Sequence, residues 1–199
     1  MPEALNGLKV IEYGNMVSAP YCAKLLAGLG AEVVKVEAQG IGDKSRYNGP
    51  FPDDIPDPEK SGLFLSLNTN KLGITLNLDK VKGISILKKL LEDADVFIEN
   101  NAPETITKCG IAYDELIKIN PKLIMVSITP FGQSGPYKDY KAYDINCCAS
   151  GGVSVGIGKP DREPLTLPLM QGGYQAGVSA AIGIMAALWA RVCPGEGKS

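Results

Sequence analysis

The chain has 199 residues, of which 45% are hydrophobic and 21% are charged, and its net charge at pH 7 is −2. This length suffices for one domain with a sizeable core, and the composition is that of a globular protein. The small net charge gives no basis for binding to nucleic acid or to an anionic membrane surface. The chain has no histidine, and its five cysteines show no CxxC spacing. We therefore expect no metal site, and, with no signal peptide at the N-terminus, reduced thiols in a cytoplasm.

Strands and helices alternate from the start of the chain. The sequence predicts a buried strand over 8–14, a helix over 19–30 with Pro20 in its first turn, and a strand over 31–37. A strand, a helix and a strand in close succession form a βαβ unit, whose strands are parallel. Residues 38–63 are rich in Gly, Pro and Asp, which predicts a long irregular loop.

The same alternation continues through the rest of the chain. Strands are predicted over 72–78, 95–100 and 122–132, and helices over 79–94, 112–120 and 142–152. In the helix over 79–94, one apolar face is expected to hold Ile84, Ile86, Leu87, Leu90 and Leu91. The pattern predicts an α/β fold, with an open, mostly parallel, Rossmann-like sheet and helices on both faces. No linker divides residues 1–199.

An apolar run over 176–190 follows an uncharged turn, MQGGYQAG. The run is shorter than the about 20 residues that a membrane-spanning helix needs. It is also rich in Gly, Ala and Ser, which suit close packing. We therefore expect a helix buried inside protein and no membrane association.

Polar segments follow four of the predicted strands, over 14–20, 36–40, 99–104 and 128–137. In open parallel sheets, ligands bind beyond the carboxyl ends of the strands. The helix after the first segment can direct its N-terminus at a phosphate. Polar loops lie at this edge of any α/β sheet, so these segments predict a ligand site without identifying the ligand.

A dinucleotide is one candidate ligand. Glu37 lies 23 residues after Gly14, near the usual offset of a carboxylate that binds a ribose. The GxGxxG motif is missing, because Gly14 is followed by Asn15, Met16 and Val17. A dinucleotide-dependent oxidoreductase is therefore a hypothesis with an incomplete motif.

Three residues near the end of the predicted sheet are candidate nucleophiles. Cys147 and Cys148 have no histidine to form a thiolate, and free cysteines are often simply buried. Asp144 follows a glycine-rich turn and can either line a cleft or stabilise a helix dipole as an N-terminal acid. Both interpretations of Asp144 remain open.

Several segments together resemble the family III CoA-transferases, which include formyl-CoA and carnitine CoA-transferases and share their fold with α-methylacyl-CoA racemases. In family order, these segments cover 5–37, 68–79, 94–100, 113–137, 142–144 and 180–198. The resemblance implies a longer chain, of which residues 1–199 form the N-terminal part of a nucleotide-binding-like large domain. It also implies two interlocked chains, either identical or different.

The resemblance further implies an acyl-CoA and a carboxylic acid as substrates, and no metal. From their positions in the family pattern, and for Glu37 from its distance to Gly14, seven residues are expected to lie along CoA. They are Met16, Val17, Ser18, Glu37, Leu72, Asn100 and Asn101. Some family phosphate contacts are missing, because Ala38 and Leu72 stand where the family has arginine. To bind the CoA phosphates without these arginines, the chain would have to use Lys35, Lys44, Arg46 or Lys71 instead.

The transferases carry a catalytic Asp in the turn before the small-residue helix. It attacks the acyl-CoA to form a mixed anhydride and then an aspartyl-CoA thioester. That position is Gly173 here, and no residue over 171–175 is a carboxylate. The racemase likeness implies an acid here and an upstream histidine, where this chain has Thr129 and Pro130.

Two main hypotheses follow for the catalytic residue, which stays unknown. In the first, this chain is the subunit of a hetero-oligomer that lacks the nucleophilic Asp, and a partner supplies it. In the second, the protein is a self-sufficient transferase, or a racemase-like enzyme, with a displaced catalytic residue such as Asp144. The oxidoreductase is the third hypothesis.

Overall fold

Five parallel strands form one sheet in the order β3-β2-β1-β4-β5, in a computed structural model that describes residues 3–193. The strands are β1 (Lys9–Tyr13), β2 (Glu32–Ala38), β3 (Leu72–Leu76), β4 (Val96–Glu99) and β5 (Ile124–Ser127). Val10 of the central strand pairs with Val33 on one side and Val96 on the other. The predicted open parallel sheet is confirmed.

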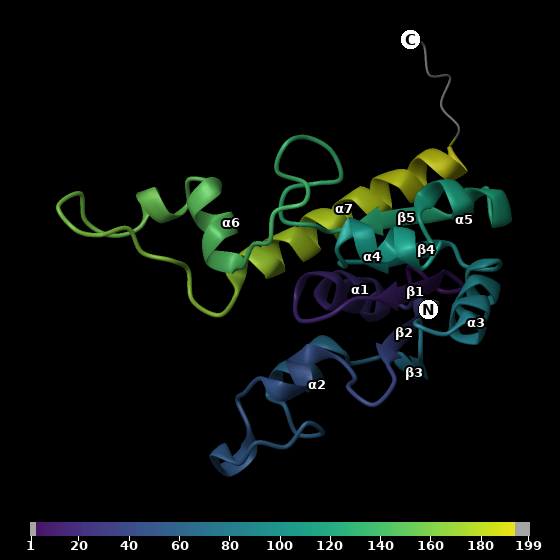
Figure 1. The fold of residues 1–199 in the computed structure, drawn as a ribbon, viewed down its shortest axis with the longest axis horizontal. Helices are drawn as coiled ribbons and strands as arrows, with labels where there is room; N and C mark the ends of the chain where they lie inside the picture. Colours follow the sequence, from purple (N-terminus) through teal and green to yellow (C-terminus); the bar gives the residue numbers. More distant parts are fainter. Residues whose placement is uncertain (1–2, 194–199) are drawn as a thin grey trace, which may run out of the picture.

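Helices cover both faces of the sheet. Successive strand residues point to opposite sides, so apolar side chains on each face need a helix to bury them. Val10 packs into the core beneath α1 (Ser18–Gly28) and α7 (Gln171–Val192), whereas Ile11 packs into the core on the other face. That second core is covered by α3 (Val81–Leu91), α4 (Pro103–Lys108) and α5 (Tyr113–Ile119). Figure 1 shows this layering, with α7 crossing above the sheet.

The apolar face of α3 differs from the predicted one. Leu87 and Leu91 are buried, but Ile86 is 41% exposed. Gly83, which was not predicted, takes a buried position where a Cβ would collide with the main chain of Asn77. The close approach of the preceding turn therefore sets the rotation of this helix.

The segment over 38–63 is more regular than the composition predicts. It contains two short 3-10 helices, Lys44–Tyr47 and Pro52–Asp54, and leads into α2 (Gly62–Leu67), which the sequence pattern did not predict. The Ser61 hydroxyl donates to the Ser45 carbonyl over 2.7 Å and accepts from the Phe64 N–H. Local polar contacts thus replace the expected irregular loop.

Helix α7 departs from the prediction in length and in burial. It has 22 residues, because it begins at Gln171, before the apolar run. Among residues 3–193, α7 is the one helix that is long and apolar enough to cross a membrane, judged by length and composition alone. Its length therefore does not exclude a membrane span, contrary to the prediction from the run over 176–190. One face is buried, through Gly177, Ala181, Ile184 and Leu188. An adjacent apolar stripe is exposed, along Val178, Ile182, Met185, Trp189 and Val192.

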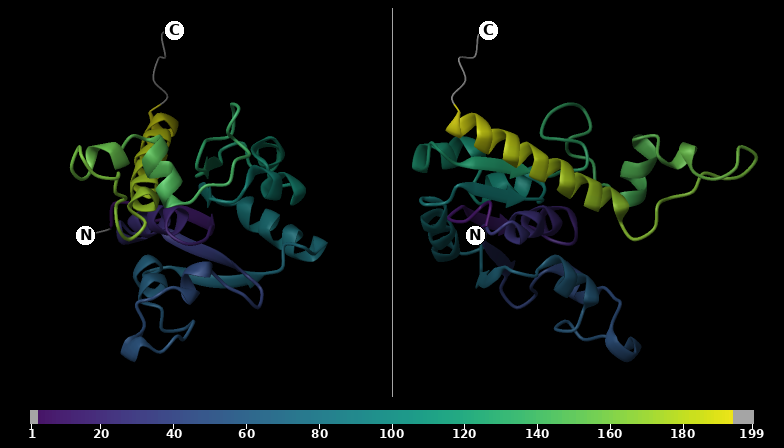
Figure 2. Two further views of the ribbon diagram at one scale, coloured as in Figure 1. Left: turned by 60° about the vertical axis from the view of Figure 1, so that its left-hand side comes forward. Right: turned by 180° about the vertical axis from the view of Figure 1, so that it is seen from behind.

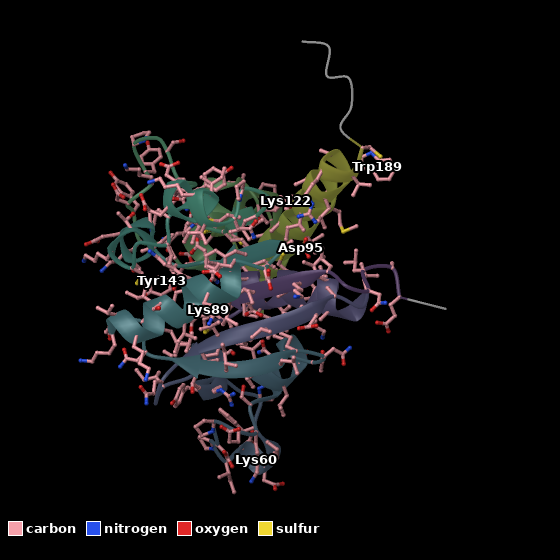
Figure 3. All side chains as sticks on the ribbon, turned by 90° about the vertical axis from the view of Figure 1, so that its right-hand side faces the viewer. Lys60, Lys89, Asp95, Lys122, Tyr143 and Trp189 are labelled. Carbon is pink, nitrogen blue, oxygen red and sulfur yellow. The ribbon has the colours of Figure 1, made fainter. Side chains whose placement is uncertain are left out.

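A polar contact fixes the C-terminal end of α7 to the sheet. Arg191 donates to Oδ1 of Asp95 over 2.8 Å and to the Lys122 carbonyl over 3.2 Å. Asp95 and Lys122 lie beneath this end of α7, with Trp189 outward of them (Figure 3). The other end of α7 projects past the sheet toward α6 (Asp144–Ser150), as the right-hand view of Figure 2 shows.

Candidate functional site

A cavity of about 370 Å³ lies at the carboxyl end of the sheet. Strands β1 and β4 are neighbours in space although a crossover separates them in sequence, and ligands bind at such a switch point in open α/β sheets. The wall combines the loop after β1, the ends of β4 and β5, α6 and the first turn of α7. Its residues are Met16, Val17, Ser18, Asn100, Ile128, Thr129, Pro130, Ala142, Tyr143, Asp144, Cys147, Met170, Gly172, Gly173 and Ala176.

The loop after β1 is held by side chains on both sides. Asn100 accepts from the Asn15 N–H over 2.9 Å and donates to the Asn15 carbonyl over 2.8 Å. The Met16 N–H donates to Oδ1 of Asp43 over 3.0 Å, which supports Met16 in the left-handed region at φ 63°. These two N–H groups are therefore occupied, and they do not offer the donors that a dinucleotide pyrophosphate would need.

Beneath this loop lies a buried network of two lysines and two carboxylates. Lys35 lies 2.7 Å from Oε1 of Glu12 and 2.7 Å from Oδ2 of Asp43. Lys71 lies 2.7 Å from Oε2 of Glu12 and donates to the Pro20 carbonyl over 2.8 Å. Removing one partner of such a network would leave an uncompensated buried charge, so these groups hold the floor of the site.

Burial and pairing shift the two lysine pKa values in opposite directions. For Lys71, burial outweighs its partners and lowers the pKa to about 8. For Lys35, burial acts in the same direction, but Glu12 and Asp43 together outweigh it and raise the pKa. Both ammonium groups are almost fully buried and paired. This pairing argues against Lys35 and Lys71 as the cations that compensate for the missing phosphate contacts.

Glu37 and Arg46 also pair with each other rather than facing a ligand. Arg46 donates through Nε to Oε2 over 2.7 Å and through Nη2 to Oε1 over 2.9 Å, and the Asp43 N–H donates to Oε2. The guanidinium lies 3.6 Å above the ring centre of Phe64. Both carboxylate oxygens are occupied, which argues against the predicted ribose contact of Glu37. Of the four expected cations, Lys44 alone makes no ion pair within residues 3–193.

Four of the seven residues expected along CoA line the cavity, namely Met16, Val17, Ser18 and Asn100. Asn101 lies beside it, with its side-chain amide donating to the Tyr13 carbonyl over 2.8 Å. Leu72 is 60% exposed on the edge strand β3 and does not reach the cavity. That the four lining residues contact CoA stays a prediction.

Asp144 and Gly173 meet in the cavity wall. The Gly173 N–H donates to Oδ1 of Asp144 over 3.0 Å, so the carboxylate lies at the N-terminus of α7, where the helix dipole favours a negative charge. Asp144 thus both lines the cavity and lies at a helix N-terminus, and the helix whose N–H it accepts from is α7. Ile128 belongs to the predicted polar segment over 128–137, whereas the sequence did not indicate Tyr143 or Met170 as wall residues, because their places depend on tertiary packing.

The thiols near Asp144 are poor candidate nucleophiles. Cys147 lines the cavity, and burial, Asp144 and Cys148 each raise the pKa of its thiol. Cys148 lies with its Sγ 3.6 Å from Oδ2 of Asp144. A raised pKa keeps a thiol protonated and unreactive at neutral pH. In the described part of the chain, no group of histidine, cysteine or acidic side chains is arranged to hold a metal ion.

The sheet order, the cavity at the switch point and the small-residue helix beside it define an open α/β ligand-binding domain. The sequence matches CoA-transferase family III over residues 5–199, and the chain belongs to that family. It is 37% identical over 198 residues to the formyl-CoA:oxalate CoA-transferase of Rhodopseudomonas palustris strain BisB18, covering 100% of this chain and 45% of that protein. The enzyme of the same name from Afipia carboxidovorans is 38% identical, with 46% of it covered.

Solved structures agree with this assignment. A CAIB/BAIF family protein from Brucella suis superimposes with a TM-score of 0.88 and 34% identity, over 96% of this chain and 50% of that one. Rv3272 from Mycobacterium tuberculosis gives a TM-score of 0.85 and 30% identity, with 52% of that chain covered. The chain thus spans about half the length of the relatives it matches. The dinucleotide-dependent oxidoreductase hypothesis has no support from these likenesses.

Proposed function

We propose that the full protein transfers CoA between an acyl-CoA and a carboxylic acid, and that this chain belongs to a subunit without the nucleophilic carboxylate. The observation that carries the proposal is Gly173. It lies in the cavity wall, in the first turn of α7, and offers only its main chain. A carboxylate that attacks the thioester must come from elsewhere.

In this proposal, a partner subunit of the same family supplies the nucleophile in an interlocked dimer. The cavity of this chain binds a CoA thioester against Met16, Val17, Ser18 and Asn100. The rigid loop after β1 supports such binding, because its main chain is already held by Asn100 and Asp43. Preorganised loops lose little entropy when a ligand binds. We expect the complex to act in the cytoplasm.

A second candidate function is supported by the location of Asp144. Within residues 3–193, its Oδ2 has the Cys148 thiol as its one hydrogen-bond partner, so a self-sufficient transferase, or a racemase-like enzyme, would use this carboxylate. Its Oδ1 is engaged with the N-terminus of α7. That contact stabilises the anion and makes it a weaker nucleophile, which favours the first candidate.

The two candidates differ in what the purified full-length protein does alone. Formyl-CoA with oxalate, the pair in the names of the relatives, and a panel of other thioesters and acids would be assayed with and without the partner that co-purifies from the native source. We expect transfer only with an Asp-bearing partner. Transfer by this protein alone, abolished by Asp144→Asn, would instead establish the second candidate.

A further inference from the structure

The side chain of Val17 crowds the space where a Cβ at position 173 would lie. A Cβ built on Gly173 would lie 3.1 Å from Cβ and 3.2 Å from Cγ1 of Val17, whereas unstrained carbon contacts lie at about 3.5–4.0 Å. Val17 is only 3% exposed, and its branched side chain has few alternative rotamers.

The packing of α7 on α1 keeps these two residues together. One turn after Gly173, a Cβ on Gly177 would lie 2.7 Å from the Ser18 carbonyl oxygen, a main-chain atom. The rings of Tyr21 and Tyr174 meet edge to face with centroids 4.9 Å apart. Helix α7 therefore lies as close to α1 as glycine allows, and it cannot tilt away without breaking these contacts.

We infer that Val17 obstructs the nucleophile position of this cavity, so that two residues, Val17 and Gly173, keep position 173 without a carboxylate. The inference rests on the proposed function. If Val17 obstructs position 173, the carboxylate of Gly173→Asp alone is displaced from the thioester. Adding Val17→Ala removes the obstructing methyl groups and lets that carboxylate reach the thioester. Val17 is a positioning residue here, since it acts through the side chain that it excludes.

The step that the double variant would gain is the attack on the thioester. An oxygen of the new carboxylate bonds to the acyl carbon as the bond from that carbon to sulfur breaks, which leaves a mixed anhydride and a CoA thiolate. The thiolate then bonds to the side-chain carbonyl carbon of the anhydride, and the acyl group leaves as a carboxylate. The product is a CoA thioester on the protein, which hydroxylamine cleaves.

A double-mutant cycle on the full-length protein tests the contact without any substrate. Gly173→Ala and Val17→Ala are made singly and together, and the melting temperatures are compared. We expect Gly173→Ala to lower the melting temperature in the wild-type background and to cost less or nothing beside Val17→Ala. Gly183→Ala is the matched control, because a Cβ there meets nothing within 4 Å. An equal effect of Gly173→Ala in both backgrounds would overturn the inference.

Intact-mass spectrometry tests the consequence for chemistry. The thioester used is whichever of formyl-, acetyl-, succinyl- and benzoyl-CoA most raises the melting temperature of the wild type. We expect Val17→Ala with Gly173→Asp to form the CoA adduct at least about tenfold faster than Gly173→Asp alone, the factor that a modest overpacking strain produces. Val17→Ala with Gly173→Asn is the control and should form none. Equal rates, or no adduct from the double variant, would overturn the inference.

The two failures are distinguishable. If no thioester raises the melting temperature of the wild type, the proposed binding of a CoA ester fails, and the double-mutant cycle still decides the role of Val17. If a thioester binds and the wild type itself forms an adduct, the proposed lack of a nucleophile fails instead.

Discussion

The main-chain N–H of Gly173 donates a hydrogen bond of 3.0 Å to the carboxylate of Asp144, 29 residues earlier in the chain. The bond joins the start of α7 to the start of α6, and both residues lie in the cavity wall. The carboxylate that remains in this site thus engages the N-terminus of α7 at the residue where the family's nucleophile would stand.

This contact predicts a graded loss of stability on changing Asp144. Asp144→Ala removes an acceptor at a helix N-terminus, which should cost about 1 kcal/mol in the free energy of unfolding. Asp144→Asn keeps an acceptor oxygen and should cost less. Urea denaturation of the full-length protein measures both. Equal losses for the two variants would mean that the hydrogen bond to Gly173 contributes nothing.

The pairing of Glu37 with Arg46 predicts that these residues support the fold rather than the ligand. Arg46→Lys keeps the charge but loses the two-pronged contact, so the melting temperature should fall while the affinity for CoA stays unchanged. Glu37→Gln should behave in the same way. Isothermal titration with CoA, at a temperature where each variant is folded, measures the affinity. Weaker CoA binding by Glu37→Gln would restore the ribose contact that the motif offset predicts.

The low pKa of Lys71 predicts how stability depends on pH. In the folded protein, burial lowers this pKa from 10.5 to about 8. Between these values the unfolded chain keeps the proton and the folded chain does not, so the contribution of Lys71 to stability rises with pH, by up to about 1.4 kcal/mol per pH unit. The free energy of unfolding of the wild type relative to Lys71→Met should therefore increase across this window.

The control for that experiment is Lys60→Met, since Lys60 is an exposed residue that pairs with Asp57 and projects from the edge of the molecule (Figure 3). The difference between the wild type and Lys60→Met should stay flat over the same pH range. A flat or falling difference for Lys71→Met would show that Lys71 keeps its proton in the folded state.

The exposed apolar face of α7 predicts poor solubility for the 199-residue chain alone. Ile182 is 65% and Trp189 71% exposed, and contiguous apolar patches promote association. Ile182→Gln with Trp189→Gln should therefore raise the fraction of monomer in sedimentation velocity. Leu188→Gln, which changes a buried residue of the same helix, should not. A monodisperse wild-type chain with a cooperative melt would contradict this prediction.

The strands and the longer helices of the fold could be predicted because their signals are local. Short apolar runs, and an alternating pattern for β3, predicted the five strands, and their alternation with helices predicted that the strands are parallel. Helices α2 and α4 have six residues each, too few for a periodic pattern to emerge. Helix α7 began earlier than predicted because its first turn is made of glycine and polar residues, whose helical conformation depends on the contacts with α1 and α6.

The site was harder to predict because its polar groups act over long sequence distances. Arg46 follows β2 and Lys71 directly precedes β3, and a cation near a strand end suggests a phosphate contact. In the fold, however, Arg46 pairs with Glu37 and Lys71 pairs with Glu12. Lys71 pairs with Glu12 across 59 residues, and no local pattern records that pairing. The absence of a carboxylate around Gly173 needed only the sequence; the obstruction by Val17 needed the packing of α1 against α7.

The most direct measurement for the proposed function is the mass of each chain in the complex purified from the native source, taken during turnover with a thioester that the complex uses. We predict a hydroxylamine-sensitive CoA adduct on an Asp-bearing partner chain and none on the chain that carries Gly173. An adduct on this chain would contradict the account and would direct the search for the nucleophile to Asp144.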